Sequence, residues 1–368
     1  MPNILWFNWR DITNPEAGGA EVLTHEIAKR LVSKWNHEIT LFTSSFRNSS
    51  KQEYLDGVKI VRQGGIYGVY RRAKKYYKKN KSDFDLIIDE INVRPFLTPK
   101  FVNDQKPIIA LIHQISPEQF LLELPFPLSY IGRYYLEKKW LSYYKHTLTV
   151  TVSNSTKKDL EELGFRRICV MPQGLSVKPL NKVGQKEPNP TLAFIGRLKK
   201  HKLPHHALLA FMLIKKKIPN AKLWVIGEGY MRGKLETEFR VEDITFFGRV
   251  DSELKYDLLR RAHLVMVPAI REGWALVVTE SNAMGTPVVA YNVPGLRDSV
   301  RNGHTGMLVE ENSPEGLSSS AVNLLQNYNI LEEYSSNCLS FSKQFSWDIS
   351  AGIFEKKVRD TIASGRHR

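Results

Sequence analysis

A chain of 368 residues, 42% of them hydrophobic and 25% charged, is long enough for two globular domains and too rich in apolar residues to be disordered. Its two cysteines, Cys169 and Cys338, exclude a disulfide framework, and neither a signal-peptide pattern nor an apolar run of roughly 20 residues is present, so we expect an intracellular protein without a membrane span. The formal net charge of +15 indicates an anionic partner, and charge alone does not choose among nucleotides, nucleic acid and lipid.

In the first half of the chain, short apolar runs alternate with amphipathic stretches. The stretch 20–31 repeats apolar residues at helical spacing and is predicted to be a helix. This alternation is typical of a parallel sheet with helices on both faces. The predicted strands are 3–8, 38–43, 86–89, 108–113, 147–152 and 168–171.

The pattern lapses at 176–190, a segment rich in Pro, Gly, Asn and Lys that we interpret as a linker, and then resumes. We therefore predict an α/β chain of two doubly wound, Rossmann-like domains, 1–176 and 177–347, with a helix at about 348–368 rejoining the first. Two such domains facing each other would leave a deep cleft at the carboxyl ends of their strands, where ligands bind. The strands predicted for the second domain are 191–195, 222–226, 244–247, 264–267, 287–291 and 307–309.

Two loops that follow the first strand of each domain have the composition of phosphate-binding loops. Gly18 and Gly19 precede a helix, where bare backbone and free N–H groups suit a phosphate, although a flexible turn explains the pair equally well. Arg197 and Lys202 follow the strand at 191–195, and two cations there would suit a diphosphate and its departure. A solvated basic turn is the alternative for this second loop.

Three further features lie at predicted strand ends. Glu272 lies in a loop and Glu280 in the short helix behind it, so the two carboxylates would hold different parts of one ligand, or else belong to an ordinary helix surface. Gly227 and Gly229 line a nucleotide or form a plain turn, because the next glycine comes one residue too late for a dinucleotide-binding motif. His113 ends a strand and is either a ligand contact or a buried histidine.

These motifs occur in an order that resembles the retaining GT-B glycosyltransferases of family 4, also called glycosyl transferases group 1. The resemblance spans nearly the whole chain. It departs from the family at Ala275, where glycine is frequent, and at Gln173, where asparagine is commoner. The matching segments are Gly18-Gly19-Ala20-Glu21, His113, Val152 to Lys157, Pro172-Gln173-Gly174, Gly196-Arg197-Leu198 with Lys202, Phe247-Gly248, Glu272 to Glu280, Gly285 to Ala290, Gly295-Leu296, Asn302-Gly303 and Phe345-Ser346-Trp347.

The resemblance implies transfer of a hexose from a UDP-sugar or GDP-sugar to a hydroxyl acceptor, with retention of anomeric configuration. Arg197 and Lys202 would bind the diphosphate, Glu280 the ribose and Glu272 the transferred sugar, while His113 would line the sugar site beside Gly19. These members are thought to react on one face of the sugar, so no carboxylate nucleophile is needed. The residues implied for catalysis are His113, Arg197, Lys202 and Glu272, and those for donor binding are Gly18, Gly19, Gly227, Gly229, Arg249, Val250, Gly273, Trp274, Ala275, Leu276 and Glu280.

We predict neither a metal nor a cofactor beyond the donor itself. Asp83 and Asp85 imitate a metal-binding pair of another transferase class, but they precede a strand instead of following one. Pro204 interrupts the histidine cluster at 201–206, and no thiolate accompanies it.

We expect the acceptor to be a glycan or a lipid-linked sugar. The basic run at 71–81 and the aromatic, lysine-containing segment at 120–140 are consistent with a cytoplasmic protein that rests on anionic lipid. A solvated basic face with ordinary core aromatics explains them equally well. A basic nucleic-acid-binding protein is the main rival, but the sequence has no recognisable reading module, so we expect no nucleic acid. A sugar-nucleotide epimerase or an inverting GT-B transferase is the nearer alternative.

Overall fold

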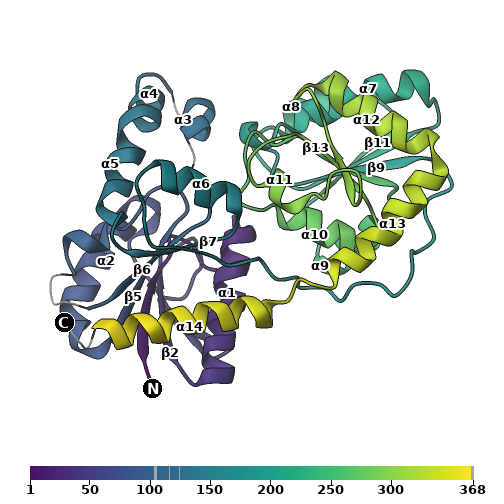
Figure 1. Ribbon diagram of the computed structural model, residues 1–368. Coiled ribbons are helices and arrows are strands. Elements are labelled where there is room, and N and C mark those ends of the chain that lie inside the picture. Colours follow the sequence, from purple (N-terminus) through teal and green to yellow (C-terminus); the bar gives the residue numbers. More distant parts are fainter. Residues whose placement is uncertain (103–105, 116, 124, 366–368) are drawn as a thin grey trace. The chain divides into compact units, whose positions relative to one another are not determined.

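The computed structural model describes residues 1–102, 106–115, 117–123 and 125–365. The chain forms two compact units. Unit 1 comprises Met1–Pro117, Tyr130–Gly174 and Ser346–Arg368, and unit 2 comprises Glu118–Ser129 and Leu175–Phe345. Each unit is built around a largely parallel sheet with helices packed against it (Figure 1).

The sheet of unit 1 has the strand order β3-β4-β2-β1-β5-β6-β7-β8. The six predicted strands are all present, with ends that differ from the prediction by at most two residues. The prediction missed the antiparallel hairpin of β3 and β4, whose turn residues Asp56 and Gly57 have φ of 48° and 80°. An Asp-Gly turn between alternating strands is a hairpin signal, so this feature was readable from the sequence. The strands are β1 (Asn3–Phe7), β2 (Glu38–Thr43), β3 (Gln52–Leu55), β4 (Val58–Arg62), β5 (Leu86–Ile91), β6 (Ile108–Ile112), β7 (Leu148–Thr151) and β8 (Ile168–Val170).

Helices cover both faces of this sheet because successive strand side chains point in opposite directions. On one face Trp6 of β1 stacks on Phe354 of α14, with ring centroids 5.3 Å apart. On the other face Leu5 and Phe7 pack against Val69 of α2. The helical elements are α1 (Gly19–Trp35), α2 (Gly65–Asn80), η1 (Lys81–Asp83), η2 (Thr98–Lys100), α4 (Leu128–Ile131), the π-helix η3 (Gly132–Leu136), α5 (Glu137–Leu141), η4 (Ser142–Tyr144), α6 (Asn154–Glu162) and α14 (Trp347–Gly365).

Unit 2 has a parallel sheet with the order β11-β10-β9-β12-β13-β14, around a continuous core of buried aliphatic and aromatic side chains. The six predicted strands are present, with ends displaced by at most one residue. The strands are β9 (Thr191–Ile195), β10 (Lys222–Ile226), β11 (Ile244–Gly248), β12 (Leu264–Val267), β13 (Val288–Ala290) and β14 (Gly306–Leu308). The helices are α3 (Pro117–Glu123), η5 (Lys200–Lys202), α7 (Pro204–Lys217), α8 (Arg232–Glu238), α9 (Ser252–Arg261), α10 (Leu276–Ala283), α11 (Leu296–Ser299), α12 (Pro314–Gln326) and α13 (Tyr328–Ser342).

Each sheet reverses its direction of growth at one point. In unit 1 the chain proceeds from β1 to β2 on one side and later adds β5 on the other, so β1 and β5 are neighbours at the reversal. In unit 2 the corresponding neighbours are β9 and β12. The loops that leave such a pair diverge, and ligands bind in the resulting crevice beside the carboxyl ends of the strands.

Candidate functional site

In unit 2 the structure brings Lys202 and Glu272 together at the reversal point. Lys202 follows β9 in η5, Glu272 follows β12, and Lys202 Nζ forms an ion pair with Glu272 Oε1. Arg197 lies half-buried in the same loop as Lys202, and its guanidinium has no partner among the described residues. The loops at this reversal point therefore carry two cations and one carboxylate, and Arg197 is available to an anion.

Backbone contacts between the loops after β9 and β10 account for Gly227 and Gly229. A Cβ on Gly227 would lie 2.0 Å from Gly196 O, and one on Gly229 would lie 2.3 Å from Leu198 O. The two loops also share a hydrogen bond from Leu198 N to Glu228 O at 2.8 Å. These glycines therefore hold the loop that carries Arg197, and the fold requires them whether or not they contact a ligand.

The loop that carries Glu272 is held by similarly close backbone packing. Glu272 N donates to Pro294 O at 3.1 Å, and a Cβ on Gly295 would lie 2.0 Å from Glu272 O. After Gly273 and the buried Trp274, the chain reaches Ala275, the N-cap residue of α10, at φ 67°. Left-handed backbone is costly for alanine, which gives a physical reason for the glycine that the family often has at that position.

Glu280 lies on α10, five residues into the helix that Leu276 opens, and it meets two side chains from α9. Its Oε1 accepts from Lys255 Nζ at 2.7 Å and from the Tyr256 hydroxyl at 3.3 Å. The sequence prediction missed both partners, because spacing within α9 does not reveal which neighbouring helix it meets. Arg249 and Val250 follow β11; Arg249 is exposed and Val250 packs against the core of unit 2.

In unit 1 the loop between β1 and α1 is fixed by hydrogen bonds to Glu21. Glu21 Oε2 accepts from Gly18 N at 2.7 Å, and Glu21 Oε1 accepts from Arg10 Nε at 3.2 Å. Gly18 has φ of −143°, and a Cβ added there would meet no atom closer than 3.7 Å. The fold itself therefore does not require glycine at position 18, in contrast to Gly227.

A buried ion pair anchors the preceding part of this loop. Arg62, the last residue of β4, donates from Nε and Nη2 to the two carboxylate oxygens of Asp11 at 2.7 and 2.9 Å, and it also pairs with Glu53. Both Asp11 and Arg62 are buried. Neither was predicted, because they lie 51 residues apart and only the pairing of β4 with β2 brings them together.

His113 lies just beyond β6, and its ring meets a carboxylate that the sequence prediction overlooked. Its Nε2 is 2.8 Å from Oε1 of Glu90, a fully buried residue of β5. The Thr156 hydroxyl donates to the His113 carbonyl at 3.3 Å. The predicted residues Gly18, Gly19 and His113 thus belong to unit 1, and the remaining predicted site residues belong to unit 2.

Members of the two sets that resemble metal sites in the sequence, the Asp83–Asp85 pair and the histidine cluster at 201–206, form hydrogen bonds to protein groups. Asp85 Oδ2 accepts from Asn3 N at 2.8 Å, and His201 Nδ1 is 2.8 Å from Glu123 Oε1 of α3. Burial lowers the pKa of His201, although the hydrogen bond to Glu123 opposes that shift. Within the described residues, no group of three or more His, Cys, Asp or Glu side chains is placed to hold a metal ion. No described helix has the length and apolar character needed to cross a bilayer.

Two family models match consecutive parts of the chain. Residues 17–178 match Glycosyltransferase Family 4, and residues 179–339 match Glycosyl transferases group 1. An uncharacterized glycosyltransferase of Methanocaldococcus jannaschii is 22% identical over 93% of this chain and 95% of its own length. The D-inositol 3-phosphate glycosyltransferase of Corynebacterium glutamicum is 30% identical, but over only 47% of this chain and 44% of that relative.

Solved structures resemble the fold over almost the whole chain. Sucrose-phosphate synthase from Thermosynechococcus elongatus has a TM-score of 0.80 at 16% identity, covering 99% of this chain and 100% of that one. The Anabaena protein HepE, solved with UDP and glucose, has a TM-score of 0.74 at 16% identity, covering 98% of this chain and 100% of its own. At such identities the likeness concerns the fold, which is the GT-B fold of two parallel-sheet α/β domains.

Proposed function

Since the chain belongs to the glycosyl transferases group 1 and is a glycosyltransferase, we propose that it moves a hexose from a UDP-sugar or GDP-sugar to a hydroxyl acceptor with retention of configuration. The observation that carries the proposal lies at the reversal point of the sheet of unit 2, where Lys202 forms an ion pair with Glu272 and Arg197 lies in the same loop as Lys202. Uridine is our first choice of base, because HepE was solved with UDP-glucose.

In this proposal the two cations act on the leaving group. Arg197 and Lys202 bind the diphosphate and stabilise the negative charge that develops as the bond between the anomeric carbon and the phosphate oxygen breaks. The acceptor oxygen bonds to the same face of that carbon and gives its proton to the departing phosphate. Glu272 contacts the transferred sugar, and Glu280 accepts hydrogen bonds from the ribose hydroxyls.

In this proposal unit 1 contributes backbone at Gly18 and Gly19, which lies against the donor diphosphate, and the side chain of His113. Because the fold does not require glycine at position 18, we assign Gly18 and Gly19 to close approach of the donor diphosphate at the start of α1. His113 is assigned to a hydroxyl of the transferred sugar. The proposal predicts that substitution of Gly19 or His113, like substitution of Arg197 or Lys202, weakens turnover of the donor.

A panel of nucleotide sugars, tested with EDTA present, examines the proposal directly. We expect at least one diphosphate sugar to raise the melting temperature and to be hydrolysed slowly, with both effects lost in Arg197→Ala/Lys202→Ala. A matched control, Lys216→Ala/Lys217→Ala, removes two exposed lysines of α7 and is expected to behave like the parent. Equal losses in both double variants would contradict the proposed role of the crevice. An anomeric proton signal showing that the product has the opposite anomeric configuration to the donor would contradict retention.

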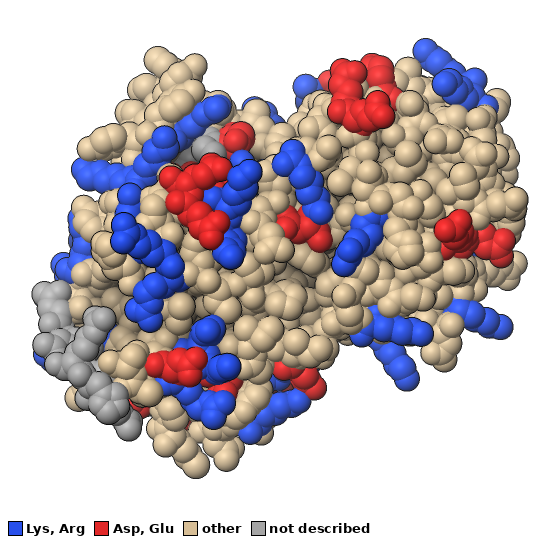
Figure 2. Space-filling model, viewed as in Figure 1, with Lys and Arg blue, Asp and Glu red and all other residues tan. Residues whose placement is uncertain are grey.

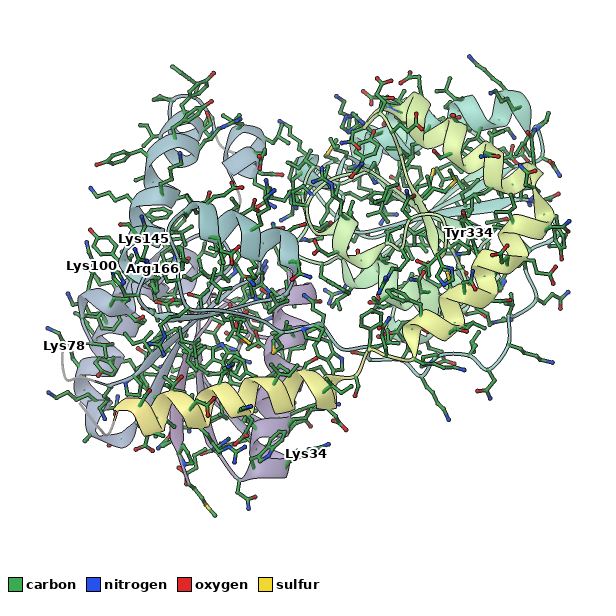
Figure 3. All side chains as sticks on the ribbon, viewed as in Figure 1. Lys34, Lys78, Lys100, Lys145, Arg166 and Tyr334 are labelled. Atoms are coloured by element: carbon green, nitrogen blue, oxygen red, sulfur yellow. The ribbon has the colours of Figure 1, made fainter. Side chains whose placement is uncertain are left out.

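We further propose that the acceptor is presented at an anionic membrane surface. The six cations of α2 are exposed on the side opposite Val69, Ala73 and Tyr77, which are buried in the core of unit 1. Lys and Arg side chains are numerous on the face of unit 1 seen in Figure 2. Figure 3 labels Lys78, Lys100, Lys145 and Arg166 on one side of that unit. The cations of α2 are Arg71, Arg72, Lys74, Lys75, Lys78 and Lys79.

Exposed aromatic side chains accompany these charges. Tyr130, Tyr134 and Tyr135 are more than half exposed, and the exposed Lys138 and Lys139 follow them in α5. Aromatic rings beside cations are typical of surfaces at the lipid interface. Flotation with phosphatidylcholine vesicles, with and without phosphatidylglycerol, tests this: we expect retention only on the anionic vesicles, reduced in Tyr134→Ser/Tyr135→Ser. Failure to float on either kind at moderate salt would remove the membrane proposal.

A further inference from the structure

Glu90 is a buried carboxylate at the centre of a hydrogen-bond network in unit 1. It lies on β5 with no exposed side-chain surface. Its Oε2 accepts from Trp6 Nε1 of β1 at 2.8 Å, and the Thr24 hydroxyl of α1 lies 2.8 and 2.6 Å from its two oxygens. His113 Nε2 lies 2.8 Å from Oε1. Three separate elements thus direct polar atoms at one buried carboxylate.

The chemistry of these partners determines where the imidazole proton lies. An indole N–H only donates and an ionised carboxylate only accepts, so Glu90 needs donors on both oxygens. If Nε2 of His113 were unprotonated, it and Oε1 of Glu90 would be two hydrogen-bond acceptors 2.8 Å apart. Two buried acceptors in contact cost free energy that no hydrogen bond offsets. Nε2 of His113 must therefore carry a proton. In neutral His113 the Nδ1 atom is then an acceptor, and among the described residues it has no hydrogen-bond partner.

We infer that Glu90 is a positioning residue that holds His113 in its Nε2–H tautomer, so that Nδ1 accepts a hydrogen bond from a hydroxyl of the bound sugar. The ligand in this statement rests on the proposed function, whereas the tautomer rests on the network alone. The hydrogen bond from Thr156 fixes the backbone carbonyl of His113, and the contact with Glu90 holds the ring at Nε2.

Replacement of Glu90 by glutamine should reverse the tautomer, because the indole of Trp6 fixes the orientation of the amide. Trp6 Nε1–H must keep an acceptor, so the amide oxygen takes the position of Oε2 and the NH2 group faces His113. Nε2 would then have to accept, and the proton would move to Nδ1. Adding Trp6→Phe removes that constraint, so the amide is free to turn its oxygen toward His113 and part of the population should return to the original tautomer.

Long-range 1H–15N NMR of the uniformly 15N-labelled full chain measures the tautomer. The His113 signals are identified by their loss in His113→Asn. We expect a protonated Nε2 in the parent, a protonated Nδ1 in Glu90→Gln, and partial restoration of the Nε2–H form in Trp6→Phe/Glu90→Gln. An unprotonated Nε2 in the parent protein overturns the inference without any variant at Glu90. An unchanged tautomer in a folded Glu90→Gln variant overturns it as well.

Kinetics tests the functional half of the inference separately. With deoxy analogues of the preferred nucleotide sugar, the parent should lose about tenfold to a hundredfold in kcat/KM when one hydroxyl is removed, since a single hydrogen bond at a sugar site has that value. In Glu90→Gln the sugar hydroxyl would have to accept from Nδ1–H and redirect its own proton, so we expect that discrimination to shrink while the affinity for UDP stays unchanged. A uniform loss with every donor and with UDP would mean a purely structural role. If no nucleotide sugar binds the parent, the proposed function fails, and the NMR result still decides the tautomer.

Discussion

Substitution of Gly295 by alanine should displace the backbone of Glu272 and lower the catalytic rate, in addition to destabilising unit 2. Gly295 has φ of 82°, where an alanine costs about 1–2 kcal/mol of backbone strain. Its Cβ would also lie 2.0 Å from Glu272 O, whereas ordinary contact begins at 3.4 Å, so the Glu272 backbone must retreat by about 1.4 Å. Because a displacement of about 1 Å can cost about a hundredfold in rate, we expect kcat/KM for the nucleotide sugar to fall by that factor.

Gly303 offers a matched control for the strain alone. It has φ of 73°, but an added Cβ would meet nothing closer than the Tyr334 hydroxyl at 3.8 Å. Gly303→Ala should therefore lower the melting temperature by a few degrees with little effect on turnover. Thermal unfolding and initial rates of donor turnover should be measured on both variants. A Gly295→Ala variant with the parent's kcat/KM, or equal losses of rate in the two variants, would refute the reasoning.

Three further outcomes follow from contacts elsewhere in the molecule. Glu280→Gln should weaken UDP binding by about tenfold and leave pyrophosphate binding unchanged in calorimetry, because the proposed ribose contact is weakened while Arg197 and Lys202 are untouched; equal weakening of both ligands would contradict its assignment. His263 Nδ1 accepts from Thr191 N at 3.1 Å, and burial lowers the pKa of His263 from 6.5 to about 4. As the pH falls, the unfolded chain therefore binds a proton at His263 before the folded chain does. The free energy of unfolding measured in urea should decline as the pH falls from about 6.5 toward 4. That decline should be smaller in His263→Asn, and an identical pH profile in the variant would exclude His263 as its source. Arg62→Lys keeps the charge but loses the bidentate contact with Asp11. Backbone hydrogen exchange in residues 8–18 should therefore quicken by about tenfold or more. Unchanged exchange there would show that the ion pair does not anchor the loop.

Local sequence predicted the regular elements well because the strands of a parallel sheet are buried on both faces. Such strands appear as short continuous apolar runs, as at Ile108–Ile112 and Leu264–Val267, and need no knowledge of their neighbours. The hairpin at Gln52–Leu55 and Val58–Arg62 escaped because its outer strand is exposed and mixed in composition. Its Asp56-Gly57 turn was the available signal, and it was overlooked.

The candidate site was predictable as far as it consists of loops that directly follow strands. Arg197 and Lys202 after β9, and Glu272 after β12, were placed by chain order alone. The strand order decided that β9 and β12 are neighbours, and hence that Lys202 and Glu272 form an ion pair across 70 residues of sequence. The ordered set of motifs supplied the assignments of roles, which remain predictions.

What the sequence by itself determined was the kind of chain: two α/β units, a cation loop, a carboxylate loop and the family to which they belong. What only the tertiary structure decided was the set of partners that hold those loops. Glu90 lies 23 residues from His113, Arg62 lies 51 from Asp11, and Lys255 lies 25 from Glu280. Periodicity describes which face a residue occupies within its own element, but contacts between elements depend on strand order and register, which no local pattern contains.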